Sequence, residues 1–290
     1  MEEKGVLDQR DLPDKSFNDL WERIFLPKQL KDQLMAQVLL EFTVRTQLPS
    51  MATVPLHGII LLVGSPGTGK TSLAKGVASA AAANLKGGKI KFIEVEPHML
   101  TSSALGRSQR EVRQFLEGVV TEHASQGPLI VLLDEVETLV SNRSKMSLEA
   151  NPIDVHRATD AMLAGLDNLA AKFPQLLFIA TSNFEGALDP AFVSRADVVL
   201  RIEKPNREAC ELILRDTVAA MGEKWPAMKK LLDNPKFGSV AEETDGLDGR
   251  QIRKAVLSAC TLNMEVALNP GLLTLEQLRQ ALKQAKVIES

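Results

Sequence analysis

The sequence predicts an α/β fold in which a parallel sheet is flanked by helices and followed by a separate helical domain. Five apolar runs rich in Ile, Leu, Val and Phe predict strands, because they are too short to be buried helices. They are Ile59–Val63, Ile90–Val95, Leu129–Leu133, Leu176–Ala180 and Val198–Ile202. Longer amphipathic segments alternate with these runs, and no strand-like run follows Pro205.

The segment before the first strand predicts a polar lead and a helical segment docked on the sheet. Met1–Ser16 is polar, whereas Phe17–Arg45 repeats apolar residues at helical spacing. Pro27 breaks this second stretch, since proline cannot continue a helix interior. We therefore assign residues 1–52 to this leading region.

The amphipathic segments predict the remaining helices. Three of them are long enough to cross back to the same sheet in a right-handed connection: Lys70–Ala83, Gln109–Glu122 and Asp154–Ala171. After Pro205 only helical segments follow: Arg207–Met221, Lys224–Leu232, Gly249–Val266 and Leu275–Ala285. A proline between a strand and a helix marks a domain boundary, so we expect a large α/β domain over residues 53–204 and a small helical domain over 205–290.

Composition narrows the class of protein. The 290 residues are 44% hydrophobic and 24% charged, which is typical of one or two globular domains. A net charge of −3, the absence of Tyr and the absence of Lys/Arg runs longer than a pair argue against nucleic acid as a partner. Cys210 and Cys260 have no neighbours at metal-ligand spacing, so we expect buried free thiols in a reducing compartment. Acidic residues at the N-terminus and short apolar runs predict a cytoplasmic protein without a membrane span.

The strongest motif follows the first predicted strand. It reads Gly64-Ser65-Pro66-Gly67-Thr68-Gly69-Lys70-Thr71, a complete G-x-x-x-x-G-K-[ST] that opens a helix, and an accidental Gly-rich turn is the alternative. Backbone N–H groups in such a loop cradle a β-phosphate, while the lysine reaches the β- and γ-phosphates and the threonine hydroxyl completes a Mg²⁺ shell. We expect ATP to contact Gly64, Pro66, Gly67, Thr68, Gly69, Lys70, Thr71 and Ser72.

Polar residues end two further predicted strands, at the sheet edge where α/β proteins place ligands. Asp134 and Glu135 follow Leu129–Leu133. We expect Asp134 to join Thr71 in holding Mg²⁺, and Glu135 to polarise the attacking water as general base. Two solvated acids at a strand end are the alternative. Asn183 follows Leu176–Ala180 and could hydrogen-bond the water and the γ-phosphate, although Ser-Asn after a strand is also common in turns.

Together these motifs resemble the AAA+ ATPases from about residue 17 to the end of the chain. The resemblance implies a P-loop AAA+ fold, with a five-stranded parallel sheet, flanking helices and a C-terminal helical lid domain. It also implies that Arg195 stabilises transition-state charge in the neighbouring subunit's site, with a surface arginine as the alternative. Arg250 would be the second sensor, contacting the γ-phosphate in cis, with Arg253 as a competitor for that role. A site of this kind is complete only in a ring, usually a hexamer.

Two stretches, Ala187–Asp197 and Gly249–Lys254, are similar to the pachytene-checkpoint branch of that family. The Ala196-Asp197 pair after the arginine is its most specific feature. The resemblance implies a remodeller of HORMA-domain proteins. Only about fifty residues precede the P-loop strand, as in bacterial members of cyclic-oligonucleotide anti-phage (CBASS) systems, where the ATPase disassembles an active HORMA complex and silences a CD-NTase. The alternatives are an AAA+ loader or initiator acting on DNA, a protease-associated unfoldase and a non-enzymatic scaffold that binds ATP.

The segments expected to face a ring pore depart from the family pattern. Threading members usually carry an aromatic residue in the first pore loop, and none occurs between Phe92 and Phe115. The resemblance leaves Met99, Leu100 and Leu105 as apolar residues that could grip a substrate. Ser141–Pro152 could form a second pore loop, and ordinary surface loops remain the alternative for both segments.

Overall fold

The computed structural model describes residues 5–48, 56–85, 87–95, 100, 107–141 and 152–287. The chain divides into two units. The N-terminal unit extends to Ile202, and the C-terminal unit begins at Glu203. Two short segments, Arg23–Pro27 and Ser65–Gly69, group with the C-terminal unit.

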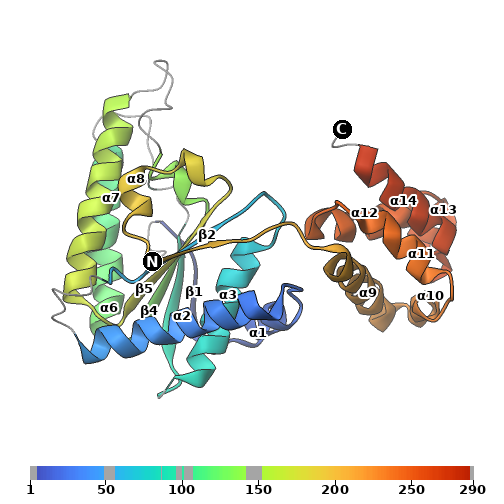
Figure 1. The fold of residues 1–290 in the computed structure, drawn as a ribbon, viewed down its shortest axis with the longest axis horizontal. Coiled ribbons are helices and arrows are strands. Elements are labelled where there is room, and N and C mark those ends of the chain that lie inside the picture. The colour runs from blue at the N-terminus through green and yellow to red at the C-terminus, as the bar shows by residue number, and fades with distance from the viewer. Residues whose placement is uncertain are drawn as a thin grey trace. The chain divides into compact units, whose positions relative to one another are not determined.

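A six-stranded sheet forms the centre of the N-terminal unit (Figure 1). Its strands follow the order β1-β3-β4-β5-β2-β6. The five predicted strands are confirmed, and they pair in parallel: β2 (Ile59–Val63), β3 (Ile90–Val95), β4 (Leu129–Leu133), β5 (Leu176–Ser182) and β6 (Val198–Arg201). The α/β fold class is therefore confirmed, and the sheet has one strand more than expected.

The additional strand is β1 (Val6–Leu12), which lies within the stretch assigned to a polar lead. It pairs antiparallel with β3, with Leu12 opposite Ile90, so the assignment of this stretch to a polar lead is wrong. Four consecutive polar residues, Asp8 to Asp11, make this segment read as polar in the sequence, but the exposure of its side chains alternates along the strand. Such alternation is typical of an antiparallel edge strand, where only one face of the strand is buried.

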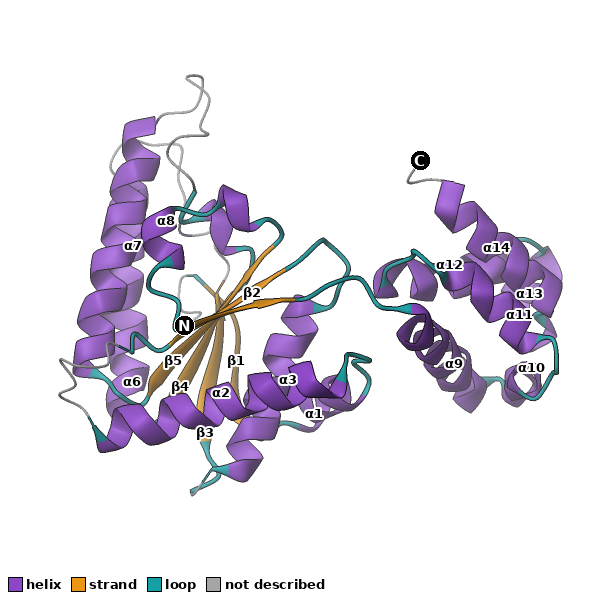
Figure 2. Cartoon of the chain, in the orientation of Figure 1, coloured by secondary structure: helices purple, strands orange, loops and turns teal. Residues whose placement is uncertain are grey.

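Helices cover both faces of the sheet (Figure 2). One face packs against α1 (Lys15–Glu22), α2 (Lys28–Gln47) and α3 (Lys70–Asn84), where Phe17 and Phe92 meet edge to face at 5.0 Å. The other face packs against α5 (Arg107–Gln114), α6 (Thr121–Gln126) and α7 (Pro152–Lys172). Burial on both faces explains why the parallel strands read as continuous apolar runs.

One predicted helix of this unit differs in detail from the structure. The segment predicted as Gln109–Glu122 contains a π-helical stretch, Phe115–Val120, between α5 and α6.

Short elements follow the strand ends near the site: η2 (Val136–Thr138) after β4, and η4 (Glu185–Ala187) and α8 (Pro190–Val193) after β5. Asp189 caps α8 by accepting a hydrogen bond from the Ala191 N–H.

The C-terminal unit is helical and has its own core. Its elements are α9 (Arg207–Lys224), η5 (Pro226–Met228), α10 (Lys229–Leu232), α11 (Phe237–Ala241), η6 (Glu242–Thr244), α12 (Gly249–Thr261), α13 (Met264–Leu268), η7 (Pro270–Leu272) and α14 (Leu275–Val287). The predicted helix Gly249–Val266 is two helices, because Asn263 adopts an extended conformation and caps α13.

Both cysteines of the chain lie in the C-terminal unit. The free thiols Cys210 and Cys260 are both buried in the core of the C-terminal unit, as expected. Across the described ranges, no helix combines the length and apolar character needed to cross a membrane.

Candidate functional site

The Gly-rich loop links the end of β2 to the start of α3. Gly67 and Gly69 have φ angles of +85° and +90°, a left-handed conformation that glycine adopts without a steric penalty. The loop begins beside the neighbouring strand, since the Gly64 N–H donates to the Ser182 carbonyl at 3.2 Å. The motif therefore has the strand, loop and helix context that the sequence predicts.

The side chain of Lys70 connects this loop to the ends of β4 and β5. It is 6% exposed, and its Nζ donates to the Gly64 carbonyl at 2.7 Å and to Asn183 Oδ1 at 2.9 Å. Asn183 Nδ2 donates in turn to Glu135 Oε1 at 3.2 Å. Three of the predicted site residues thus form one continuous chain of hydrogen bonds.

Thr71 and Asp134 lie side by side next to this chain. The Thr71 hydroxyl is 2.8 and 3.1 Å from the two Asp134 carboxylate oxygens. No group of three or more His, Cys, Asp and Glu side chains placed to hold a metal occurs in the described part of the chain. One hydroxyl and one carboxylate nevertheless suit Mg²⁺, which prefers oxygen ligands and commonly takes the rest of its octahedron from water and substrate phosphates.

Two residues that the sequence analysis did not single out hold the main chain at this edge. Thr181 Oγ1 accepts a hydrogen bond from the Glu135 N–H at 3.0 Å, and Glu137 Oε1 accepts one from the Asn183 N–H at 3.1 Å. In the sequence, Thr181 lies two residues before Asn183 and Glu137 lies two residues after Glu135. A hydroxyl or a carboxylate at that spacing is too common to select either residue.

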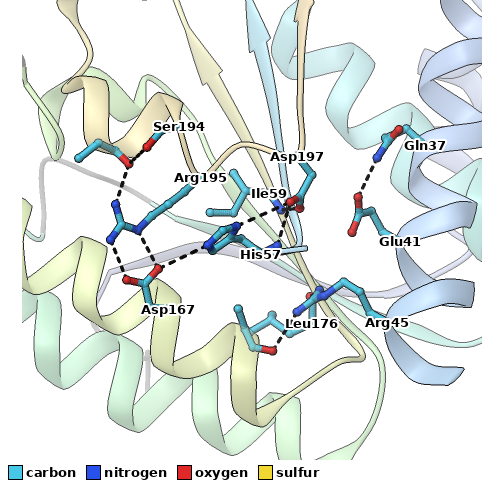
Figure 3. Close-up of polar contacts among 12 residues, drawn as sticks. Gln37, Glu41, Arg45, His57, Ile59, Asp167, Leu176, Ser194, Arg195 and Asp197 are labelled. Carbon is cyan, nitrogen blue, oxygen red and sulfur yellow. Dashed lines mark hydrogen bonds and ion pairs between the residues drawn. The ribbon is translucent and has the colours of Figure 1, made fainter. Parts of the chain in front are cut away.

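Arg195 is engaged by Asp167 of α7 (Figure 3). Its Nε and Nη2 donate to the two Asp167 carboxylate oxygens at 2.7 and 2.8 Å, and its Nη1 donates to the Ala191 carbonyl at 2.8 Å. The hydrogen bond that it donates to Asp167 raises the pKa of the Arg195 guanidinium above its ordinary value. Such a bidentate pair fixes the plane of the guanidinium as well as its position.

A series of polar contacts links this arginine to the start of β2 (Figure 3). The Asp197 carboxylate accepts from the main-chain N–H groups of His57 and Ile59, both at 2.8 Å. The His57 ring lies between Asp167 and Asp197, with nitrogen-to-oxygen distances of 3.9 and 3.8 Å. Asp197, two residues after Arg195, therefore anchors the start of β2, the strand that leads into the Gly-rich loop.

On the α2 side of Asp197 lie two buried charged residues, Glu41 and Arg45. Arg45 donates to the main-chain carbonyls of Leu176, Ala170 and Phe173, and its burial lowers its pKa. Burial, with a smaller contribution from the charge of Asp197, raises the pKa of Glu41 to about 7.

The second predicted sensor belongs to the C-terminal unit. Arg250 is exposed in the first turn of α12, whose start is capped by Asp248 and Gln251 in a capping box. Arg253 is also exposed, and its Nη1 donates to the Gly249 carbonyl of the same helix at 3.2 Å. Both arginines therefore project from the N-terminal end of one helix.

Comparisons with known proteins identify the family. A family model described as "ATPase family associated with various cellular activities (AAA)" matches residues 60–204, which hold the Gly-rich loop and both polar strand ends. The chain belongs to the AAA family of ATPases. The resemblance predicted from the motifs is thus confirmed at the level of the family.

Similar proteins place this AAA ATPase near the pachytene-checkpoint proteins. It is 50% identical to CD-NTase-associated protein 6 of Pseudomonas aeruginosa over 283 residues, which cover 98% of this chain and 93% of that protein. It is 29% identical to a putative pachytene checkpoint protein 2 of Caenorhabditis elegans over 263 residues, 83% of this chain and 62% of that protein. The predicted resemblance to this branch, including its bacterial members, is confirmed.

Two solved structures share the fold of this AAA ATPase. The structure of C. elegans PCH-2 matches with a TM-score of 0.76 and 25% identity over 100% of this chain and 78% of that chain. A chain from an E. coli HORMA:CdnC:Trip13 complex matches with a TM-score of 0.74 over 96% of this chain and 95% of that chain. Its identity is 17%, so this second match supports the fold alone.

Of the three residues expected to line a pore, the structure describes only Leu100. Leu100 is 1% exposed and packs in the core beside the sheet, so its expected role in gripping a substrate is wrong. Its apolar side chain belongs to the core cluster beside the sheet. Met99 and Leu105 lie outside the described residues. In the second expected pore segment only Ser141, in a β-bridge with Leu188, and Pro152, at the start of α7, are described.

Proposed function

We propose that this chain hydrolyses ATP as a subunit of a hexameric ring that partially unfolds or disassembles HORMA-domain complexes. In bacteria it would act in the cytoplasm as a negative regulator of a CD-NTase in CBASS anti-phage signalling. The observation that carries the enzymatic part is the hydrogen-bonded chain from Lys70 through Asn183 to Glu135, beside the Thr71–Asp134 pair.

Each of these side chains has a defined task in the proposed reaction. Lys70 binds the β- and γ-phosphates, and main-chain N–H groups of the Gly-rich loop surround the phosphates as the helix N-terminus faces them. Glu135 accepts a proton from the attacking water, while Asn183 orients the water and the γ-phosphate. Thr71 and Asp134 would hold Mg²⁺, which neutralises charge on the phosphate oxygens when bound.

The two arginines complete the site in this proposal. Arg250 would contact the γ-phosphate in cis, with Arg253 as the competing candidate. Arg195 would stabilise transition-state charge in the neighbouring subunit, a contribution that can reach about 10³–10⁵ in rate. Because three of its nitrogens are engaged by Asp167 and Ala191, Arg195 must release part of this pairing to reach a neighbour's nucleotide.

The client follows from similarity rather than geometry. CD-NTase-associated protein 6 covers nearly the whole chain at 50% identity, and its name links it to a CD-NTase. The E. coli structure described as a HORMA:CdnC:Trip13 complex contains a chain of this fold. A HORMA-domain protein as client, and a CD-NTase as its indirect target, are consistent with both.

The enzymatic part is tested by ATP turnover in three preparations. Lys70→Ala should abolish turnover, because the lysine is the main cationic contact to the phosphates. Arg195→Ala alone should also be inactive, yet mixing it with Lys70→Ala subunits should restore part of the activity if the arginine acts in trans. Undiminished turnover in Lys70→Ala would refute the site, and the absence of recovery at any mixing ratio would refute the trans role.

The client is tested by trapping. A Glu135→Gln variant should hold ATP without hydrolysing it, and it is used as bait in a lysate of the source cell with ATP. Lys70→Ala is the matched control, since it should not hold ATP. A HORMA-domain protein enriched on Glu135→Gln alone supports the proposal. DNA-replication factors or a protease in its place would indicate one of the other AAA+ roles and contradict the remodelling of HORMA proteins.

A further inference from the structure

The ends of β4 and β5 are joined by two hydrogen bonds that run in opposite directions. Thr181, on β5, accepts from the main-chain N–H of Glu135 after β4 at 3.0 Å. Glu137, after β4, accepts from the main-chain N–H of Asn183 after β5 at 3.1 Å. Each strand therefore supplies a side chain that holds the main chain of the proposed functional residue on the other. We call Thr181 and Glu137 the clamp residues.

The backbone of Glu135 needs such support. Its φ and ψ angles are +50° and 50°, and among the described residues it is the only non-glycine residue with a positive φ. The left-handed conformation costs an ordinary L-residue about 1–2 kcal/mol, and it persists where surrounding interactions determine it. The bond from the Glu135 N–H to Thr181 and the bonds from Thr138 N and Oγ1 to the Glu135 carbonyl, both 3.1 Å, supply that restraint.

The Thr181 hydroxyl has only one orientation that satisfies its contacts. Thr181 is a residue of β5 and is 1% exposed, and its hydroxyl donates to Asp134 Oδ1 at 2.5 Å. Since the single proton is used there, the oxygen is left to accept from the Glu135 N–H. One hydroxyl thus couples the Asp134 carboxylate to the main chain of Glu135.

The Glu137 carboxylate is fixed at one oxygen and open at the other. Oε1 accepts from Asn183, whereas Oε2 is buried and has no hydrogen-bond partner in the described part of the chain. Leaving a buried carboxylate oxygen unpaired is costly, so packing alone does not favour an acid at this position. What the acid provides is an acceptor for the N–H of the residue that bridges Lys70 and Glu135.

We infer that Thr181 and Glu137 are positioning residues for ATP hydrolysis, which hold Glu135 and Asn183 in the arrangement that activates water. The inference rests on the proposed ATPase function. It predicts that the clamp residues affect turnover far more than nucleotide binding, because they hold Glu135 and Asn183, which act on the attacking water, whereas the main phosphate contacts are assigned to Lys70 and the Gly-rich loop.

The test uses two pairs of variants in the full-length protein. Thr181→Val and Glu137→Ala remove the acceptor, while Thr181→Ser and Glu137→Gln retain a hydroxyl or a carbonyl oxygen in its place. For each, kcat is measured by phosphate release, and the Kd for ATP is measured with Mg²⁺ omitted so that turnover does not intervene. Thermal unfolding of each variant is recorded alongside.

The removing variants should lower kcat at least about tenfold and change Kd less than about threefold, and the retaining variants should remain within about threefold of the parent. Thr181→Val also removes the bond to Asp134, so Glu137→Ala, which leaves Asp134 untouched, isolates the effect on Asn183. Unchanged kcat in both removing variants, or equal losses in kcat and affinity, would overturn the inference. If Glu137→Ala does not fold, the Thr181 pair decides by the same criteria.

The parent protein and Lys70→Ala are assayed in the same experiment. An inactive parent would refute the proposed function itself. An active parent, an inactive Lys70→Ala and fully active clamp variants would refute only the positioning role.

Discussion

Replacing Asp197 by Ala should strongly destabilise the N-terminal unit. The carboxylate is 2% exposed and accepts two main-chain N–H groups, those of His57 and Ile59, at 2.8 Å. Hydrogen bonds to a charged group contribute about 1.5–3 kcal/mol each, which gives a gross loss of about 3–6 kcal/mol. Part of this is offset, because water can reach the half-exposed His57 and because Glu41 loses a repulsive neighbour. We expect a net loss of about 2–4 kcal/mol.

The two tryptophans of the chain allow this loss to be measured in one unit. Trp21 lies in the N-terminal unit and Trp225 in the C-terminal unit. In a Trp225→Phe background, urea unfolding followed by fluorescence reports Trp21 alone. Asp197→Asn, which keeps one acceptor oxygen, should lose about half as much free energy of unfolding as Asp197→Ala.

Asp11→Ala is the matched control on the same unit. Its side chain is 83% exposed and pairs only with Lys91 among the ion pairs of the described residues, so its loss should stay within about 0.5 kcal/mol. A loss below about 1 kcal/mol in Asp197→Ala, or a loss equal to that of Asp11→Ala, would refute the claim that Asp197 anchors the start of β2.

Two further predictions concern buried titratable groups. Burial raises the pKa of Glu41 from 4.5 to about 7, so the folded state keeps a proton that the unfolded state loses; stability should fall by about 3 kcal/mol as pH rises through this window. Glu41→Gln should remove that dependence, and urea midpoints at about pH 5 and about pH 8 measure it; an equal fall in the variant contradicts it. Burial also raises the pKa of both the Cys210 and the Cys260 thiols, so Ellman's reagent should react slowly until the C-terminal unit unfolds, in Asp197→Ala as in the parent. Rapid reaction of the native protein would contradict this.

The parallel strands could be predicted because each is buried on both faces and is apolar throughout. β1 could not be, because four of its seven residues form one polar run, Asp8 to Asp11, which also suits a loop. The predicted helix Gly249–Val266 is divided in two by the conformation of a single residue, Asn263, which the sequence does not reveal. Leu100 was assigned to a pore on family likeness, while its burial depends on the space left beside β1 and the sheet.

Some site residues could be predicted from their neighbours in the sequence, whereas others depend on contacts between residues far apart in the chain. The Gly-rich loop, the two acids after β4 and Asn183 are each readable within a few residues, because the chemistry needs those residue types at a strand end. The pairing of Arg195 with Asp167 joins residues 28 positions apart, and the bonds to Thr181 and Glu137 join residues 46 positions apart. No pattern in a single sequence selects such partners, since any of several carboxylates or hydroxyls has the right chemistry.

Strand register explains why three separate motifs meet at one edge. β5 lies between β4 and β2 in the sheet, with Ala180 opposite Leu133 and Ser182 opposite Val63. Continuing the first pairing by one residue brings Thr181 to Asp134, and continuing the second brings Asn183 to the start of the Gly-rich loop.

A shift of β5 by one residue would place Ser182 opposite Asp134 and turn the side chain to the other face of the sheet. The bond from Thr181 to Asp134 and the bond from the Glu135 N–H to Thr181 would then be lost together. The apolar residues of β5 are buried on both faces, and they resist this shift because it would displace each of them from its place in the core. The core that defines the fold therefore also sets the relative positions of the Gly-rich loop, the two acids and Asn183.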